Sequence, residues 1–466
     1  MLSRLRQEKN GITEGIIWKQ LLIFFFPILF GTFFQQLYNT VDAVVVGRFV
    51  GKEALAAVGG ATGTLINLLV GFFTGLSSGA TVIISQFYGG QKEEEVSRTV
   101  HSAIALCLAA GVIFTLVGHL CSGWALRAMD TPENIMSGAM TYLRVYFSGI
   151  IFPLIYNMGS GILRAVGDSR RPLYFLIVCC MVNLLLDLLF VVVFRWGVLG
   201  VAVATLISQA VSAGLVVLAL MKTERSYHFD PRLLRFHRDL LQKVIRIGLP
   251  AGLQSVMYGI SNVVIQSGVN AFGTDIMAAW TAYGKIDGFF WMIMSAFGVA
   301  ATTFVGQNFG AQSYARIRKS VRVSAGMAMG TTILLSILLY FFGPYIYLLF
   351  TSDQVVIEQG MLILRTLVPT YFTYVMIEIL AGAVRGTGDA LIPMIITCLG
   401  VCVLRVAWIT FAVPVWPEIR TVILSYPITW SVTSVIFVIY YLQGGWLRRQ
   451  IVKAGYAPEK RQAQKA

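Results

Sequence analysis

Gly161-Ile-Leu-Arg-Ala-Val-Gly-Asp-Ser-Arg-Arg-Pro172 returns 221 residues later as Gly382-Ala-Val-Arg-Gly-Thr-Gly-Asp-Ala-Leu-Ile-Pro393, and five of the twelve positions are identical. In each copy an apolar run ends in Arg, breaks at a glycine suited to a left-handed helix cap, and resumes after an Asp. A Pro then stands near the first turn of the next run, where its missing N–H costs little. Each copy is therefore predicted to be a tight, basic turn between two helices.

The rest of the chain follows the same internal repeat. At offsets that drift only from 223 to 221, Pro27 pairs with Pro250, Asn39 with Asn262, Ala56–Ala57 with Ala278–Ala279, and Ser85–Gly89 with Gly306–Gly310. The chain is thus predicted to be a duplication of one unit of roughly 220 residues. An even number of helices between corresponding turns makes the two repeats parallel rather than inverted.

The composition indicates a membrane protein. The 466 residues are 57% hydrophobic and 12% charged, with a mean hydropathy of +0.74, so polar groups are too few to cover a surface in water. The net charge of +14 does not indicate nucleic-acid binding, because Lys and Arg are scattered among short loops. The first apolar run, Ile16–Val46, is too long for a signal-peptide core and is predicted to remain as a span.

Twelve apolar runs reach the length of about 20 residues that crosses a hydrocarbon core of about 30 Å. They are 16–46, 54–85, 99–121, 138–163, 172–194, 198–221, 247–271, 278–305, 321–349, 361–384, 391–413 and 419–443. The predicted fold is an all-α integral membrane protein with twelve transmembrane helices in two pseudo-symmetric six-helix bundles. The predicted domains are an N-terminal bundle (1–221), a cytoplasmic basic linker (222–246), a C-terminal bundle (247–445) and a basic cytoplasmic tail (446–466).

The distribution of basic residues predicts the orientation. If Met1 is cytoplasmic, 27 of the 36 Lys and Arg residues fall in the N-terminus, the even-numbered turns and the C-terminal tail. Five fall on the outer side and four within spans. This bias agrees with the positive-inside rule. Both termini are therefore predicted to be cytoplasmic.

The connection between the halves is predicted to contain an amphipathic surface helix that starts at Asp230-Pro231, with leucines on one face and charges on the other. It is interpreted as a tether beside anionic lipid, with a regulatory switch as the alternative.

The six cysteines are expected to pack as small hydrophobic residues. Four histidines show no ligand spacing and are interpreted as incidental: His101, His119, His228 and His237.

Ionisable residues within spans are costly unless paired or hydrated, so each is a candidate site. In the first half, Asp42 and Asp187 fall in the outer parts of two outward-running helices. Asn183 lies one turn deeper than Asp187 on the same face, and Thr205 reaches a similar depth on the next helix. We expect these four oxygen-bearing side chains at one level.

This group is predicted to couple transport to a cation. Its hard oxygen ligands suit Na⁺, or one carboxyl group carries a proton instead; the alternative is that the acids merely pair with buried bases. At the repeat offsets Asp42, Asn183 and Asp187 correspond to Ile265, Leu404 and Trp408. The scaffold is duplicated and the oxygen cluster is not, which favours a functional role.

The second half carries different intramembrane charges. Lys285 and Asp287 are two residues apart and lie on nearly opposite helix faces, so they cannot easily pair. Glu378 is expected either to form an interior salt-bridge network with Arg365 and Arg405 or to contact substrate. Asp287 and Glu378 are therefore candidate cleft residues, and both alternatives stay open for them.

The chain resembles a prokaryotic member of the multidrug and toxic compound extrusion (MATE) family. The resemblance covers almost the whole chain and includes Asn39-Thr-Val-Asp-Ala-Val-Val-Val-Gly47, Gln86-Phe-Tyr-Gly-Gly90, Asn183-Leu-Leu-Leu-Asp187, Ala202-Val-Ala-Thr-Leu206 and Arg385-Gly-Thr-Gly-Asp389. It implies two bundles that face each other across a central cleft and alternate in access, driven by Na⁺ or H⁺. In the branch with an N-terminal cation site, the family's ligands match Asp42, Asn183, Asp187 and Thr205, and its polar cleft residues match Gln35, Tyr38 and Asn157.

The resemblance implies secondary active export of amphipathic, mostly cationic organic compounds. An alternative on a related scaffold is a flippase for lipid-linked saccharides, although phosphate-bearing cargo would favour a more cationic cleft. A membrane-embedded enzyme is the remote alternative, because no metal-ligand cluster and no nucleophile with a placed base occur in the sequence. We expect no cofactor beyond the coupling ion, contact with membrane lipids, a monomer, and a place in a bacterial or archaeal cytoplasmic membrane.

Overall fold

The computed structural model describes residues 11–456, and these divide into two compact helical units. We call residues 26–252 the N-terminal unit, and residues 11–25 together with 253–456 the C-terminal unit. The boundaries of these units differ from those of the domains predicted from the sequence. The start of the first long helix groups with the C-terminal helices, and residues 222–252 group with the N-terminal helices.

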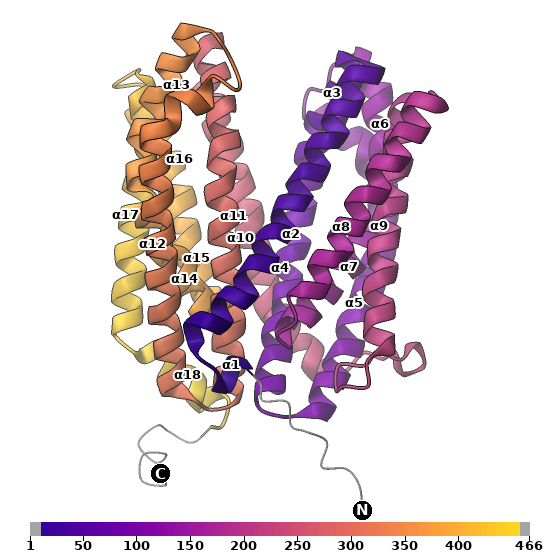
Figure 1. Cartoon of the computed structure of the whole chain (residues 1–466), viewed down its shortest axis with the longest axis vertical. Coiled ribbons are helices and arrows are strands. Elements are labelled where there is room, and N and C mark those ends of the chain that lie inside the picture. The colour runs from indigo at the N-terminus through magenta and orange to yellow at the C-terminus, as the bar shows by residue number, and fades with distance from the viewer. Residues whose placement is uncertain (1–10, 457–466) are drawn as a thin grey trace, which may run out of the picture. The chain divides into compact units, whose positions relative to one another are not determined.

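The N-terminal unit is a bundle of long helices joined by short turns (Figure 1). Helix α2 enters it from the other unit, and π-helical turns η1 and η2 extend α2 and α8. In chain order its elements are α2 (Ile17–Val45), η1 (Val46–Val50), α3 (Lys52–Gly59), α4 (Ala61–Gly89), α5 (Glu93–Ala128), α6 (Glu133–Ser148), α7 (Ile151–Ala165), α8 (Arg170–Asp187), η2 (Leu188–Val193), α9 (Gly197–Lys222), the 3-10 turn η3 (Pro231–Leu233) and the first part of α10 (Arg238–Asn270).

The C-terminal unit repeats this order, with α11 continuous where the N-terminal unit has α3 and α4, and with α15 and α16 separated by a π-helical turn. Its elements are α1 (Gly11–Glu14), the start of α2, the rest of α10, α11 (Thr274–Gly310), α12 (Tyr314–Tyr347), α13 (Gln354–Leu367), the 3-10 turn η4 (Val368–Thr370), α14 (Phe372–Gly386), α15 (Leu391–Thr397), the π-helical turn η5 (Cys398–Val403), α16 (Leu404–Ala412), α17 (Ile419–Leu442) and α18 (Gly445–Lys453).

The predicted all-α membrane fold is confirmed. Within residues 11–456, nine helices are long and apolar enough to cross a membrane, and two bent pairs raise that number to 11. The bent pairs, α6–α7 and α13–α14, each turn by 50°. Helix α10, whose run contains more polar residues, is the twelfth long helix. Each of the twelve predicted runs therefore corresponds to one span, although the run 54–85 covers α3 and α4 and the run 391–413 covers α15, η5 and α16.

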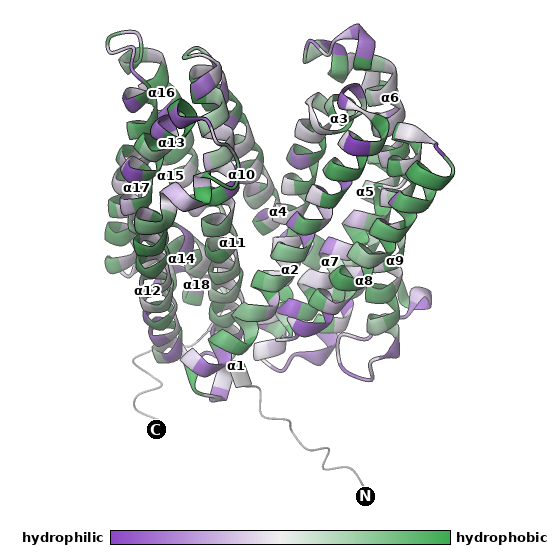
Figure 2. Cartoon of the chain, turned by 45° about the horizontal axis from the view of Figure 1, so that its top comes forward, coloured by the Kyte–Doolittle hydropathy of each residue, from purple (hydrophilic) through white to green (hydrophobic). Residues whose placement is uncertain are grey.

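Apolar side chains lie on the outside of the helices as well as between them. Leu120 and Leu349 are more than four-fifths exposed, and Phe341 is 68% exposed. In Figure 2 hydrophobic residues run along most of each helix, while hydrophilic residues gather toward the loops. A lipid environment accounts for this pattern, because such side chains would be costly to hydrate.

The repeated turn has the predicted geometry in both copies. Gly167 and Gly388 adopt φ values of 95° and 100°, which a side chain would oppose. Asp168 then accepts backbone N–H hydrogen bonds at the start of α8, and Asp389 accepts one at the start of α15. The turn therefore ends one helix and begins the next through the same capping contacts.

The linker corrects two expectations. Only the short 3-10 turn η3 follows Asp230, and residues 238–246 are the first turns of α10 rather than a separate surface helix. Two histidines are not incidental, because they fasten the linker to α5. The His101 Nε2 atom accepts the backbone N–H of Asp230 at 3.1 Å, and the His237 Nδ1 atom is hydrogen-bonded to the Ser102 hydroxyl group at 3.0 Å. Neighbouring Arg98 and Arg235 join burial in lowering the pKa of His237.

The start of α10 packs closely on α4 through glycines. Gly75 and Gly79 of α4 face Gly248 and Gly252 of α10, and a Cβ atom at any of them would clash with backbone atoms of the other helix. Two Gly-x-x-x-Gly motifs thus bring the backbones together. This close contact explains why the first turns of α10 belong to the N-terminal unit.

Candidate functional site

Four polar side chains of the N-terminal unit meet in its interior. Asp42 comes from α2, Asn183 and Asp187 from α8, and Thr205 from α9. They are almost completely buried, with exposed fractions of 7%, 1%, 0% and 3% in that order. Asp187, Asn183 and Thr205 all lie against the Asp42 carboxyl group. The structure therefore brings together the four residues that the sequence places at one level.

The protein leaves most polar atoms of this cluster without a partner. The Thr205 hydroxyl donates a long hydrogen bond of 3.5 Å to Asp42 Oδ2. The other Asp42 oxygen, both Asp187 oxygens and both polar atoms of Asn183 are buried and make no hydrogen bond within the described chain. Each unsatisfied buried polar atom costs about 1–3 kcal/mol. Such a cost is typical of a site that binds something from outside the protein.

An apolar layer closes one side of the cluster. It consists of Val45, Val46, Ala54, Tyr142, Val191, Val201 and Ala202. Its members from α2, η2 and α9 stand about one helical turn from Asp42, Asp187 and Thr205, all toward the same end of the bundle. Water and ions are therefore excluded from that side in this conformation.

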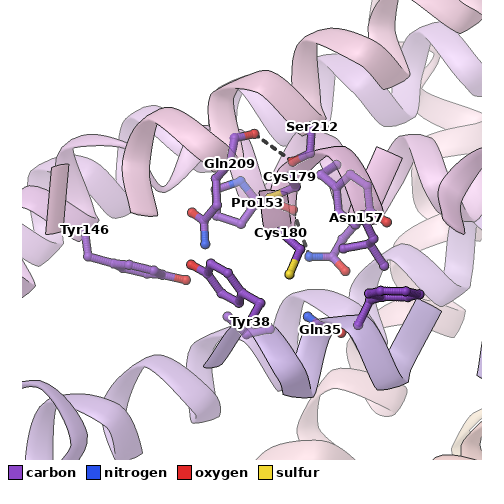
Figure 3. Close-up of a pocket in the computed structure, with 13 residues that line it drawn as sticks. Gln35, Tyr38, Tyr146, Pro153, Asn157, Cys179, Cys180, Gln209 and Ser212 are labelled. Carbon is purple, nitrogen blue, oxygen red and sulfur yellow. Dashed lines mark hydrogen bonds between the residues drawn. The ribbon is translucent and has the colours of Figure 1, made fainter. Parts of the chain in front are cut away.

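A polar pocket lies on the opposite side. Tyr38, Cys179 and Gln209, one or two turns from the cluster along α2, α8 and α9, line a cavity of about 70 Å³ together with Gln35 and Asn157. In Figure 3 the polar ends of Tyr38, Tyr146 and Gln209 point toward one another. Tyr38 also lies beside Asp42 and Thr205, so it is adjacent to both the pocket and the buried oxygens.

The two acids stand next to irregular helix geometry. η2 begins directly after Asp187, and η1 begins four residues after Asp42. π-helical turns often occur at functional sites, because the extra residue re-aims neighbouring side chains. Here they accompany the turns that place both carboxyl groups in the bundle interior.

The arrangement can hold one small cation or one proton. Two carboxyl groups, an amide oxygen and a hydroxyl oxygen are the hard ligands that Na⁺ accepts. Two adjacent carboxylates in a nonpolar interior cannot both stay charged without a counter-ion, so a shared proton satisfies them equally well. The residues present fit both ions, and neither fit requires a further side chain.

The acids of the C-terminal unit form a separate, satisfied network. Asp287 accepts hydrogen bonds from the hydroxyls of Tyr283 and Tyr371 and from the indole N–H of Trp291. Glu378 accepts one from Tyr374 at 3.2 Å. Gln35, Tyr38 and Asn157, by contrast, line the pocket beside the N-terminal cluster.

The expected salt-bridge network of Glu378 does not form. Arg365 is exposed, and buried Arg405 instead stacks over the Tyr426 ring at 4.0 Å and donates to Thr429. Lys285 is exposed, and no ion pair joins it to Asp287 in the described chain. Aromatic hydroxyl and indole groups supply the hydrogen bonds to Asp287 and Glu378 instead. The positive charge that acts on Glu378 is that of Arg385.

Comparison with known proteins shows the family to which the chain belongs. A family profile described as MatE matches residues 27–189 and 250–409, one match in each repeat. The chain belongs to the MatE family. It is 28% identical over 94% of its length to a probable multidrug resistance protein, YoeA, of Bacillus subtilis, covering 96% of that protein. It is 27% identical over 93% of its length to a second, YpnP, of the same organism, covering 97%.

The fold of this MatE protein also matches solved structures. A structure described as the outward-facing conformation of a multidrug resistance MATE family transporter superposes with a TM-score of 0.88. The identity is 22%, and the match covers 95% of this chain and 99% of that one. The likeness establishes a common fold.

Sequence reasoning did not select several residues of the MatE pocket. Tyr146 and Gln209 line it, and Tyr142 lies beside Thr205. Gln209 stands four residues after Thr205, so it shares a helix face with a residue already selected. That spacing was a usable signal, whereas the tyrosines look like ordinary interfacial aromatics in the sequence.

Arg385 of the repeated turn has partners, and its replacement is expected to destabilise the protein. It donates to the Gln254 side chain at 3.2 Å and provides the positive charge nearest to Glu378. Arg385→Gln should lower stability by about 2 kcal/mol, the usual value of a hydrogen bond from a charged donor. Thermal unfolding in detergent measures the loss. An unchanged melting temperature would contradict the structural role.

Proposed function

We propose that this protein is a secondary active exporter that exchanges amphipathic, mostly cationic organic compounds for H⁺ or Na⁺. The observation that carries the proposal is the buried cluster of Asp42, Asn183, Asp187 and Thr205, whose polar atoms are mostly unsatisfied. Membership of the MatE family and two relatives named as probable multidrug resistance proteins support it. The N-terminal cluster is proposed as the coupling-ion site.

Cargo and ion are proposed to communicate through α2. Tyr38 of α2 lines the pocket and also lies beside Asp42 of the same helix. A cation that draws the carboxyl groups together would therefore move the helix that borders the cargo pocket. Pro27 lies inside α2 and removes one backbone hydrogen bond there, so the helix can bend or repack when the site is filled.

The protein is proposed to lie in a bacterial or archaeal cytoplasmic membrane with both termini inside. The expected result of a labelling experiment follows from the bias of Lys and Arg toward the even-numbered turns. In a cysteine-free background, a cysteine at His228 in the linker should react only from the cytoplasm. A cysteine at Asp353, in the loop before α13, should react only from outside. Reaction of both from the same side would exclude the proposed topology.

A gradient experiment tests the exchange itself. Lipid vesicles that contain the purified protein are loaded with a fluorescent organic cation. A pH gradient and a sodium gradient are then imposed in separate trials. Export of the dye should follow at least one gradient and stop when an ionophore collapses it. Dye movement that ignores both gradients would contradict cation-coupled exchange, and it would favour a passive path or another driving force.

A further inference from the structure

A second cavity of the N-terminal unit is lined by a half-buried arginine without a partner among the described residues. The cavity has a volume of about 60 Å³ and lies between α2, α7 and α8. Arg164, at the C-terminal end of α7, lines it with Thr32, Gln35, Asn157 and Ser169. No residue lining the cavity is acidic. Across residues 11–456, no hydrogen bond or ion pair of the Arg164 guanidinium group is found.

The repeat shows what such an arginine normally contacts in this fold. Arg385 is the equivalent of Arg164 in the C-terminal unit. It donates to Gln254 at 3.2 Å, and its charge acts on Glu378. At the repeat offsets, Gln254 corresponds to Gly31 and Glu378 corresponds to Asn157. The N-terminal unit therefore lacks both the amide and the carboxylate that accompany the arginine in the other unit.

Both missing groups would occupy the cavity. Gly31 and Asn157 each line it, as Arg164 does. Asn157 donates one N–H to the Pro153 carbonyl oxygen at 2.8 Å, and no side chain of Gly31 fills the remaining space. The residues that line the cavity include three with donor groups, namely Arg164, Gln35 and Ser169. A guanidinium group pairs best with a planar oxyanion, which accepts two parallel hydrogen bonds.

We propose that this cavity, the Arg164 pocket, binds an oxyanion group, a carboxylate or a phosphate, in the place that Glu378 and Gln254 take in the other unit. The cavity has room for about four water molecules, which suits one such group and not a whole drug-sized molecule. It shares Gln35, Tyr156, Asn157 and Leu176 with the pocket of Figure 3. An organic molecule could thus place its oxyanion at Arg164 and its apolar part beside Leu176.

Binding to purified protein tests the Arg164 pocket without any transport step. In dodecyl maltoside, calorimetry and thermal unfolding are measured with benzoate, with inorganic phosphate and with phosphatidic acid. Benzyl alcohol serves as the uncharged match for benzoate. At least one oxyanion should bind and raise the melting temperature, while benzyl alcohol should do neither. Benzoate alone would identify an organic carboxylate as the ligand, phosphatidic acid alone a lipid headgroup, and inorganic phosphate a free anion.

Two substitutions remove the site by different routes. Arg164→Gln removes the positive charge, and Gly31→Gln supplies the amide partner that Arg385 has in the other unit. A Cβ atom at Gly31 would meet only Leu176 Cδ1 at 3.4 Å, an ordinary contact, so the side chain can be accommodated. Each substitution should weaken oxyanion binding about tenfold or more. Arg164→Lys keeps the positive charge, so it should retain part of the oxyanion affinity.

The stability of the variants separates binding from folding. Because Arg164 has no partner in the protein, Arg164→Gln should melt no lower than wild type without ligand, in contrast to Arg385→Gln. The proposal is overturned if none of the three oxyanions binds the wild type, or if Arg164→Gln binds them with unchanged affinity. If Arg164→Gln fails to fold, Gly31→Gln serves as the test by itself. Oxyanion affinity that is unchanged in Gly31→Gln then overturns the proposal.

Discussion

Asp187→Asn is expected to abolish ion-driven export while the protein stays folded. Asp187 is fully buried, and neither of its oxygens has a protein partner. An amide of the same shape carries no negative charge to balance Na⁺ and does not bind and release a proton near neutral pH. It also removes one of two neighbouring acidic groups from a nonpolar interior, so stability should not fall.

The measurement is gradient-driven dye export from vesicles, together with the melting temperature in detergent. The matched control is Asp353→Asn, the same substitution at an exposed helix cap where Asn also serves. Export should drop to the level of protein-free vesicles in the first variant and remain in the second. Normal export by Asp187→Asn under both gradients would show that the coupling ion binds elsewhere.

The affinity of the wild-type protein for an organic cation is expected to depend on the coupling ion. If the filled cluster holds cargo more weakly than the empty one, protons or Na⁺ weaken cargo binding, and by linkage cargo weakens theirs. Affinity for a fluorescent lipophilic cation should then fall as pH decreases or as Na⁺ increases. Couplings of this kind amount to about 5–150-fold.

Asp42→Asn should flatten that dependence. Asp42 contributes one of the two carboxyl groups, and its helix α2 also carries Tyr38 of the pocket. Equilibrium binding to purified protein, across pH and with Na⁺ replaced by choline, gives the comparison. A wild-type affinity that responds to neither ion would refute this coupling mechanism, even for a protein that exports drugs.

The sequence alone determined the duplication, the number of helical runs and the set of candidate ion ligands. The reason is that these properties are local or periodic. Apolar runs must be helical to satisfy their backbone in lipid, and the turns at Gly167 and Gly388 need a residue without a side chain. Asp42, Asn183, Asp187 and Thr205 stood out because polar groups within spans are costly wherever they pack.

Only the tertiary structure decided which groups meet and which remain unsatisfied. The expected pairing of Glu378 with Arg365 and Arg405 failed, because Tyr374 one turn away on the same helix donates to Glu378 and Arg405 stacks on Tyr426 of another helix. The ring that Arg405 contacts across helices leaves no periodic trace in the sequence. Residues 238–252 belong to the N-terminal unit because of glycine contacts between α4 and α10. Arg164 and Arg385 occupy matching places in the repeated turn, yet one is bonded and the other faces a cavity. Part of that difference comes from Gln254, 131 residues before Arg385, which only folding brings to the turn.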